Sequence, residues 1–250
     1  MSGHSKWSTI KRKKGAADSK RGKIFTKLIK EITVAAKEGG GDENSNPRLR
    51  TAISTAKSSN MPAANIDKAI KRGTGELPGI VYEEASYEGY SPGGAAIFIL
   101  ALTDNKNRTV SEIRHMLAKA DGSLAGPGSV AWIFENQGLV LVSTEGVQED
   151  DVFALALEAG ADDMIKEGDV FEVISSAENY EAVKAAFDAS DFDVKSAELT
   201  KVPSNLTIIE GEDAKKTLKL LEDLENHDDV QNVFSNFDID ESIIEEMAAV

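Results

Sequence analysis

The stretch RGKIFTKLIKEITVAAKEGGG, residues 21–41, decides the fold of the N-terminal part of this chain. Its apolar residues recur at the i, i+3, i+4, i+7 spacing of one buried helix face; they are Phe25, Leu28, Ile29, Ile32 and Ala36. Lysines follow the same period and, at roughly 100° per residue, fall on the opposite side; they are Lys20, Lys23, Lys27, Lys30 and Lys37. Three glycines at 39–41 then end the helix. We therefore predict an amphipathic helix over residues 21–37.

Two shorter helices are predicted to follow it. Asn46 and Pro47 are an N-cap and a proline at the first helical position, and Pro62 opens a further helix that Gly73 ends. The expected inner faces consist of Leu49, Ala52, Ile53, Ala56, Ile66, Ala69 and Ile70. The expected outer faces carry Arg50, Lys57, Lys68, Lys71 and Arg72. Three short helices that share one apolar centre predict a small bundle with a cationic exterior.

Charge is distributed unevenly along the chain. Residues 1–75 hold 17 lysines and arginines against 6 acidic residues, whereas the remainder holds 11 against 37, for a net charge of -15. A basic segment is the electrostatic footprint of polyanion binding. The acidic remainder would repel nucleic acid and confine contact to the basic end, or would itself meet a basic protein surface.

A basic arm, residues 1–20, precedes the bundle. Arms of this composition are often disordered and fold on binding. Trp7 is suited to stack on an unpaired base and His4 to contact phosphate, although docking of Trp7 onto the bundle is an equal alternative. Solvated lysines are the other explanation of the cationic face, but ten basic residues against one acidic in the first thirty favour nucleic acid. The predicted nucleic-acid-binding residues are His4, Lys6, Trp7, Lys11, Arg12, Lys13, Lys14, Lys20, Arg21, Lys23, Lys27, Lys30, Arg48, Arg50, Lys57, Lys68, Lys71 and Arg72.

Strand and helix patterns alternate beyond residue 79. The first predicted elements are a hairpin (81–90 and 95–102), a helix (107–120) and a strand (129–134). A compact unit follows, with strands at 139–143, 163–166, 170–174 and 197–202 and helices at 150–159 and 179–189. Its order, β-α-β-β-α-β, is the ferredoxin-like pattern. A helix at 213–226 and a strand at 229–237 close the chain.

These elements predict an α+β fold with a small N-terminal helical bundle and two α/β domains. The first hairpin, helix and strand need the last helix and strand to complete a sheet, so the ferredoxin-like unit is predicted to be inserted into the other domain. The predicted domains are residues 1–78, residues 79–135 with 204–250, and residues 136–203.

Composition excludes several classes of site. The absence of cysteine excludes disulfides, thiolate zinc sites and cysteine nucleophiles, and fits a reducing compartment. No apolar run approaches the roughly 20 residues that span a bilayer, and the first residues lack the apolar region of a secretory signal. We expect a cytoplasmic protein without contact to a membrane.

Motifs of catalysis are missing. The chain has no phosphate-binding glycine loop, zinc-protease motif or nucleophile elbow, and we expect neither enzymatic activity, metal nor cofactor. His227, Asp228 and Asp229 are residue types that bind metal ions, but they fit a turn between a helix and a strand better. Lys106 and Arg108 precede a helix and are predicted as a secondary anion contact, although plain helix capping explains this loop more simply.

Several long motifs resemble the YebC/PmpR family, whose mitochondrial relatives activate translation of cytochrome c oxidase subunit I. The motifs are GHSKW (3–7), KRGKIFTKLIKEITVAAKEGGGD, NPRLR, NMP with NIDKAIKRGTG, YEGYSPGGAA, LTDNKNRT, GPGSVAWIFENQG and HDDVQNVFSNFDI. The resemblance implies a helical N-terminal domain and two α/β domains, the third inserted in the second. It also implies a non-enzymatic role, either as a DNA-binding transcriptional regulator or in ribosome-associated translation of difficult stretches such as consecutive prolines. Ser91 departs from an expected glycine, and Gly15 and Ser19 depart from alanines common in the family.

Three functions follow as hypotheses. The first is a nucleic-acid-binding regulator of gene expression, monomeric or weakly dimeric. Its target is either DNA or ribosomal RNA, with basic ribosomal proteins as further partners of the acidic domains. The lysines suit phosphate contact rather than base reading, which modestly favours the ribosome. The alternatives are an acidic protein adaptor that binds no nucleic acid and, least favoured, a magnesium-dependent enzyme using Asp104, Asp228 and Asp229.

Overall fold

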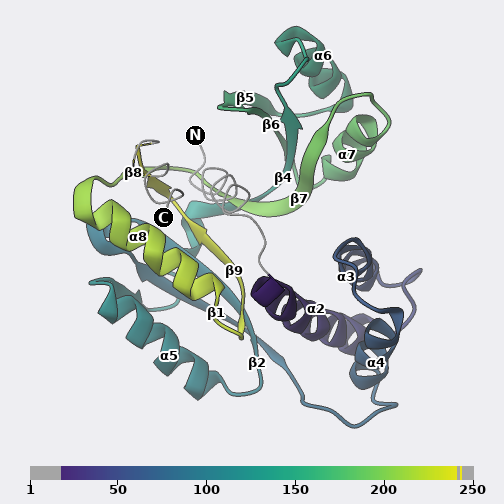
Figure 1. The fold of residues 1–250 in the computed structure, drawn as a ribbon, viewed down its shortest axis with the longest axis vertical. Coiled ribbons are helices and arrows are strands. Elements are labelled where there is room, and N and C mark those ends of the chain that lie inside the picture. The colour runs from purple at the N-terminus through teal and green to yellow at the C-terminus, as the bar shows by residue number, and fades with distance from the viewer. Residues whose placement is uncertain (1–17, 241–242, 244–250) are drawn as a thin grey trace.

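The computed structural model describes residues 18–240 and residue 243 (Figure 1). It confirms the α+β class: three helices form a bundle, and most of the remaining elements build two four-stranded antiparallel sheets with helices packed on them. Within the described residues, no helix combines the length and the apolarity that crossing a membrane requires.

The helical bundle consists of α2 (Asp18–Gly39), α3 (Pro47–Ser58) and α4 (Ala63–Gly73), as predicted. Asn46 caps α3, because its side-chain oxygen accepts from the Leu49 amide at 3.0 Å. Its Nδ2 donates to the carbonyls of Ala35 and Gly40, at 2.8 and 2.9 Å, and so ties α3 to the end of α2. The apolar centre is Ile32, Ala35, Ala36, Leu49, Ala52, Ile53, Ala56, Met61, Ile66 and Ala69.

The first sheet has the strand order β3-β1-β2-β9. Its strands are β1 (Glu83–Tyr90), β2 (Ala96–Thr103), β3 (Ser123–Ala125) and β9 (Val230–Ser235). Figure 1 shows α5 (Lys106–Lys119) and α8 (Gly211–Glu225) beside each other against this sheet. Ile97 and Ile99 of β2 pack there with Ile113, Leu117 and Leu221 in the largest apolar core. A two-stranded parallel pair, β8 (Thr207–Ile208) with β10 (Phe237–Asp238), completes this region.

The second sheet has the strand order β5-β6-β4-β7. Its elements run in the predicted β-α-β-β-α-β order: β4 (Phe134–Ser143), α6 (Glu149–Ala159), β5 (Asp163–Glu167), β6 (Val170–Ser176), α7 (Tyr180–Asp188) and β7 (Val194–Pro203). The chain leaves the first sheet after β3 and returns to it with β9. The residue boundaries given above for three domains stay a prediction.

One predicted strand is wrong. Residues 129–134 were expected to be extended, but Ala131–Ile133 form a 3-10 helix and β4 begins at Phe134, ahead of the expected 139. The cause is the buried carboxylate of Glu88, which accepts from the amides of Gly128, Val130 and Ala131 at 2.7, 2.6 and 2.9 Å. Because these three amides donate to one side chain, they cannot donate to a neighbouring strand, and the segment does not join a sheet.

The departure at Ser91 leaves the hairpin turn intact. Ser91 has a φ of -77°, which any residue adopts, and its hydroxyl donates to the Pro92 carbonyl at 2.9 Å. The positive φ values fall on Gly93 and Gly94, at 79° and 86°, where glycine is favoured. Serine at 91 therefore does not loosen this turn.

Candidate nucleic-acid interface

Two lysines in the first half of α2, Lys23 and Lys27, contact another part of the protein. The Nζ of Lys23 donates to the Asn226 carbonyl at 3.1 Å, and the Nζ of Lys27 donates to the Glu225 carbonyl at 2.8 Å. These carbonyls lie at the C-terminus of α8, where unpaired acceptors and the helix dipole favour cations. The two lysines thus cap α8 and tie the helical bundle to it.

A buried carboxylate, Asp229, lies at the centre of the same contact. Its Oδ1 accepts from the Nζ of Lys30 at 2.7 Å, and its Oδ2 accepts from the Nη2 of Arg108 at 2.6 Å. The hydroxyls of Thr103 and Thr109 also donate to Oδ2, at 3.1 and 2.7 Å. We call these five residues the Asp229 cluster. It joins α2 to α5 and to the start of β9.

Electrostatics keep the Asp229 cluster charged. Burial raises the pKa of Asp229, but hydrogen bonds from Lys30, Arg108 and Thr109 outweigh it and hold that pKa well below its usual range. Lys30 also donates to the Asp228 carbonyl at 2.9 Å, and its ammonium lies 5.3 Å from the ring centroid of Tyr82. The ammonium is therefore surrounded by acceptors within the protein.

Two predicted nucleic-acid contacts have a different placement from the one expected. Lys30 was expected on the solvent side of α2, but it is only 6% exposed, because the first sheet covers that side of the helix. Arg48 bonds three carboxylates, those of Glu31, Glu38 and Glu84, at 2.7, 2.7 and 2.6 Å. Lys30 is buried with its carboxylate, and Arg48 is half-buried and shared by three carboxylates, so phosphate would have to compete with internal partners at both residues.

The outer faces of α3 and α4 keep exposed cations. Arg50, Lys57, Lys68 and Arg72 are exposed, and in the described part of the chain none of them forms an ion pair with a carboxylate. We call these four residues the outer cationic surface. Lys71 lies beside them on α4 but pairs with Asp67 at 2.9 Å.

The arm residues lie beyond what the structure describes. They are His4, Lys6, Trp7, Lys11, Arg12, Lys13 and Lys14. Lys20 and Arg21 fall within α2, but their side chains also lie outside the described set. The predicted contacts of these nine residues with nucleic acid therefore stay predictions.

The predicted secondary anion contact has local partners. Asn105 caps α5 by accepting from the Arg108 amide at 3.1 Å, which confirms helix capping at this loop. Lys106 pairs with Glu83 at 2.8 Å, and Arg108 bonds both Asp104 and Asp229, at 2.8 and 2.6 Å. An anion at this helix N-terminus would have to compete with these carboxylates.

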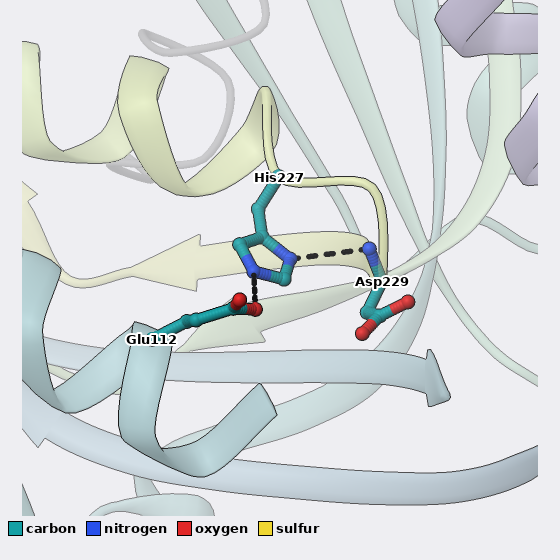
Figure 2. Close-up of side chains that lie close together, drawn as sticks. All are labelled: Glu112, His227 and Asp229. Atoms are coloured by element: carbon teal, nitrogen blue, oxygen red, sulfur yellow. Dashed lines mark hydrogen bonds and ion pairs between the residues drawn. The ribbon is translucent and has the colours of Figure 1, made fainter. Parts of the chain in front are cut away.

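The 226–229 turn carries a group with the composition of a metal site. Figure 2 shows Glu112, His227 and Asp229 close together. The Asp229 amide donates to Nδ1 of His227 at 3.1 Å, so the other ring nitrogen carries the proton and donates to Glu112 at 2.9 Å. The oxygens of Asp229 already accept from two cations and two hydroxyls. These bonds fix the turn that the sequence predicted, and they account for the group without a metal.

A polar cleft lies between the bundle and this turn. Its volume is about 620 Å³, and α2, Tyr82, Arg108 and His227 contribute to its lining. All three carboxylates of the magnesium hypothesis line this cleft, but Arg108 bonds both Asp104 and Asp229, and Asp228 is exposed on the turn. The cleft therefore lies at the contact between the bundle and the first sheet, and the ion pairs of Asp229 with Lys30 and Arg108 stabilise that contact.

Sequence reasoning missed the role of Asp229 and Glu88. Neither residue carries a local signal, because the partners of Asp229 lie 120, 121, 126 and 199 positions away and those of Glu88 lie 40 to 43 positions away. The α2 lysines were assigned to phosphate for a related reason. Helix periodicity gives the side of a helix on which a residue lies but does not say what covers that side.

Comparison with known proteins identifies the family. Residues 5–76 match the family described as "TACO1/YebC protein N-terminal domain", and residues 82–237 match "TACO1/YebC second and third domain". The chain therefore belongs to the TACO1/YebC family, which confirms the resemblance read from its motifs.

Relatives and one solved structure match over nearly the whole chain. A probable transcriptional regulatory protein of Desulfatibacillum aliphaticivorans is 54% identical, covering 98% of this chain and 100% of that protein. One of Desulfotalea psychrophila is 55% identical, covering 99% and 100%. The crystal structure of a conserved hypothetical protein from Aquifex aeolicus superposes with a TM-score of 0.79 at 44% identity, covering 89% of this chain and 92% of that one.

Proposed function

We propose that this chain is a non-enzymatic regulator of gene expression that binds nucleic acid through the outer cationic surface and the basic arm. The observation that carries the proposal is the unpaired charge on α3 and α4. Lys23, Lys27, Lys30 and Arg48 bond acceptors within the protein, whereas Arg50, Lys57, Lys68 and Arg72 are exposed and pair with no carboxylate among the described residues. Binding of phosphate by these exposed cations has a small free-energy penalty, because no ion pair with a described carboxylate has to be broken first.

The arrangement of these cations favours phosphate contact over base reading. Four residues, 59–62, connect α3 and α4, which is the length of a helix-turn-helix connection. A recognition helix, however, reads bases with its N-terminal residues. In α4 those residues are Ala63, Ala64 and Asn65, and the cations lie in the second half of the helix. Affinity for the backbone of a folded RNA therefore fits this surface better than sequence-specific reading of a duplex.

The names of the relatives favour the other target. They are called probable transcriptional regulatory proteins, and this name supports DNA as a candidate target beside ribosomal RNA. The proposal accordingly covers a ribosome-bound translation factor that relieves stalling and a DNA-bound regulator. A protein adaptor without affinity for nucleic acid is the contrasting function.

Sedimentation of a cell lysate through sucrose gradients, at low and at moderate salt, separates these functions. Comigration with ribosomes that fades as salt rises and is lost on deletion of residues 1–20 supports the translation factor. Absence from ribosomes, together with salt-sensitive retention on duplex DNA, supports the transcriptional regulator. Salt-insensitive association with a protein, and no retention on either nucleic acid, would refute the proposal in favour of the adaptor.

A further inference from the structure

An apolar pair is exposed on α6, in the second sheet region. Phe153 is 52% exposed and Leu157 is 66% exposed, although both side chains are large and apolar. They lie one turn apart on the same side of the helix. The inner face of α6 is formed by other residues, among them Val152 and Ala156, which are buried against Phe171 and Val183. Phe153 and Leu157 are thus not needed to attach α6 to its sheet.

The segment that carries this pair is acidic. Residues 144–169 hold nine acidic residues and a single cation, Lys166. At roughly 100° per residue, Glu149 and Asp150 fall on the same side of α6 as Phe153, one turn earlier. Both are exposed, and in the described chain neither has a cation as partner. The patch therefore combines an apolar centre with two exposed carboxylates, Glu149 and Asp150, which we call the acidic rim.

We propose that Phe153 and Leu157, with the acidic rim around them, form a docking site for a basic protein segment that inserts apolar side chains. Apolar surface buried by a partner gives affinity. Uncompensated carboxylates around it select a cationic partner and reject nucleic acid, because charge complementarity sets the choice and orientation of partners. This site lies beyond the nucleic-acid interface: Figure 1 shows α6 at one end of the molecule and α4 well away from it.

The two surfaces have opposite charge and separate positions. A protein with a basic bundle and an acid-rimmed apolar patch on another element can contact nucleic acid and a basic protein together, and two linked contacts raise the overall affinity. An assembly of RNA with basic proteins offers both partners. The inference does not depend on such an assembly, because the patch is defined by its own residues.

The test uses the full chain and a synthetic helical peptide with leucines at i, i+3, i+4 and i+7 and lysines elsewhere. Its binding is followed by fluorescence anisotropy against the wild type and the double variant Phe153→Ser/Leu157→Ser. A second peptide with serine in place of each leucine keeps the charge, and a third with glutamate in place of each lysine reverses it. Leu199→Ser is the matched control, because Leu199 is an exposed leucine, at 56%, on a different element.

We expect the leucine–lysine peptide to bind the wild type and the Leu199→Ser variant equally, and the double variant about tenfold or more weakly. Replacement of Glu149 and Asp150 by lysine should also weaken binding of this peptide. That loss should grow as the salt concentration is lowered, because repulsion between like charges is then less screened. Equal affinity of the double variant and the wild type would overturn the proposal, as would equal binding of the glutamate peptide. Sedimentation equilibrium that shows a dimer lost in the double variant would instead assign the patch to a second copy of this chain and would also overturn it. An unchanged melting temperature of the double variant establishes that loss of binding is not unfolding.

Discussion

Asp229 is the residue on which the contact between bundle and sheet depends. It is 3% exposed and accepts from Lys30, Arg108, Thr103 and Thr109. Removal of one partner from a buried pair leaves an uncompensated charge, which costs more than the intact pair contributes. The chain's stability should therefore respond strongly to the charge of this one side chain.

The first prediction is that Asp229→Asn lowers the free energy of unfolding by about 3–5 kcal/mol, since Lys30 and Arg108 lose their shared carboxylate. Urea unfolding at neutral pH measures it, with Asp228→Asn as the control, because that neighbouring side chain is exposed. A loss of only about 0.5 kcal/mol, the usual effect of a surface substitution, would contradict this role.

The second prediction concerns how the free energy of unfolding depends on pH at acidic pH. The pKa of Asp229 is lowered in the folded state, so its contribution is complete above the unfolded carboxyl's pKa of about 3.9 and is lost progressively as the pH falls below that value. Urea midpoints measured between neutral and acidic pH should fall less steeply below this value in Asp229→Asn than in the wild type. Parallel curves would show that the pKa of Asp229 is not lowered by folding.

Glu88 gives the third prediction, because one carboxylate organises the loop before β4. Burial raises its pKa, but the amides of Val130, Gly128 and Ala131 outweigh burial and lower it. Glu88→Gln removes the charge from these bonds and should cost about 1.5–3 kcal/mol. Trp132, whose indole donates to the Ser129 carbonyl at 3.1 Å, reports on the loop. In a Trp7→Phe background, acrylamide quenching of Trp132 should rise in Glu88→Gln; unchanged quenching and unchanged stability would oppose the assignment.

At the scale of elements, α2 acts as a cap for α8. Lys23 and Lys27 donate to the last carbonyls of α8, and each such cation contributes about 0.3–1 kcal/mol. The fourth prediction is that Lys23→Met/Lys27→Met speeds amide hydrogen exchange at the C-terminus of α8 and in the 226–229 turn. Methionine keeps helix propensity. Lys37→Met, an exposed site on the same helix, is the control. Equal protection in all three proteins would refute the capping contact.

Local pattern predicted the elements well and their mutual contacts poorly. Periodicity located α2, the Asn46 cap located α3, and the βαββαβ order anticipated the second sheet, because each signal lies within a few residues. Short-range patterns cannot show that Lys30 meets Asp229, which lies 199 residues away, or that Glu88 folds residues 129–134 into a 3-10 helix. Consequently the candidate site changed more than the fold did. Lys23, Lys27 and Lys30 of α2 form internal contacts, whereas the outer cationic surface on α3 and α4 stays exposed.

At the scale of the whole molecule, charge separation is the organising feature. Lys30 of the bundle pairs with Asp229 beside the first sheet, whereas the outer cationic surface on α3 and α4 is exposed. Most of the 43 Asp and Glu residues lie outside the bundle, where their charge repels a phosphate group. Substitution of Lys23, Lys27 and Lys30 by glutamate would disturb the docking of the bundle, so it does not test nucleic-acid binding cleanly.

The most direct test of the central claim measures the affinity for ribosomal RNA and for duplex DNA over a range of salt concentrations. The variant is Lys57→Ala/Lys68→Ala/Arg72→Ala, and the matched control is Arg114→Ala/Lys119→Ala/Lys195→Ala, which removes the same charge from exposed positions elsewhere. We predict that only the first variant weakens binding, and that it lowers the slope of log affinity against log salt by about one for each lost phosphate contact. Equal affinities and slopes for the two variants would contradict the claim that the outer cationic surface meets nucleic acid.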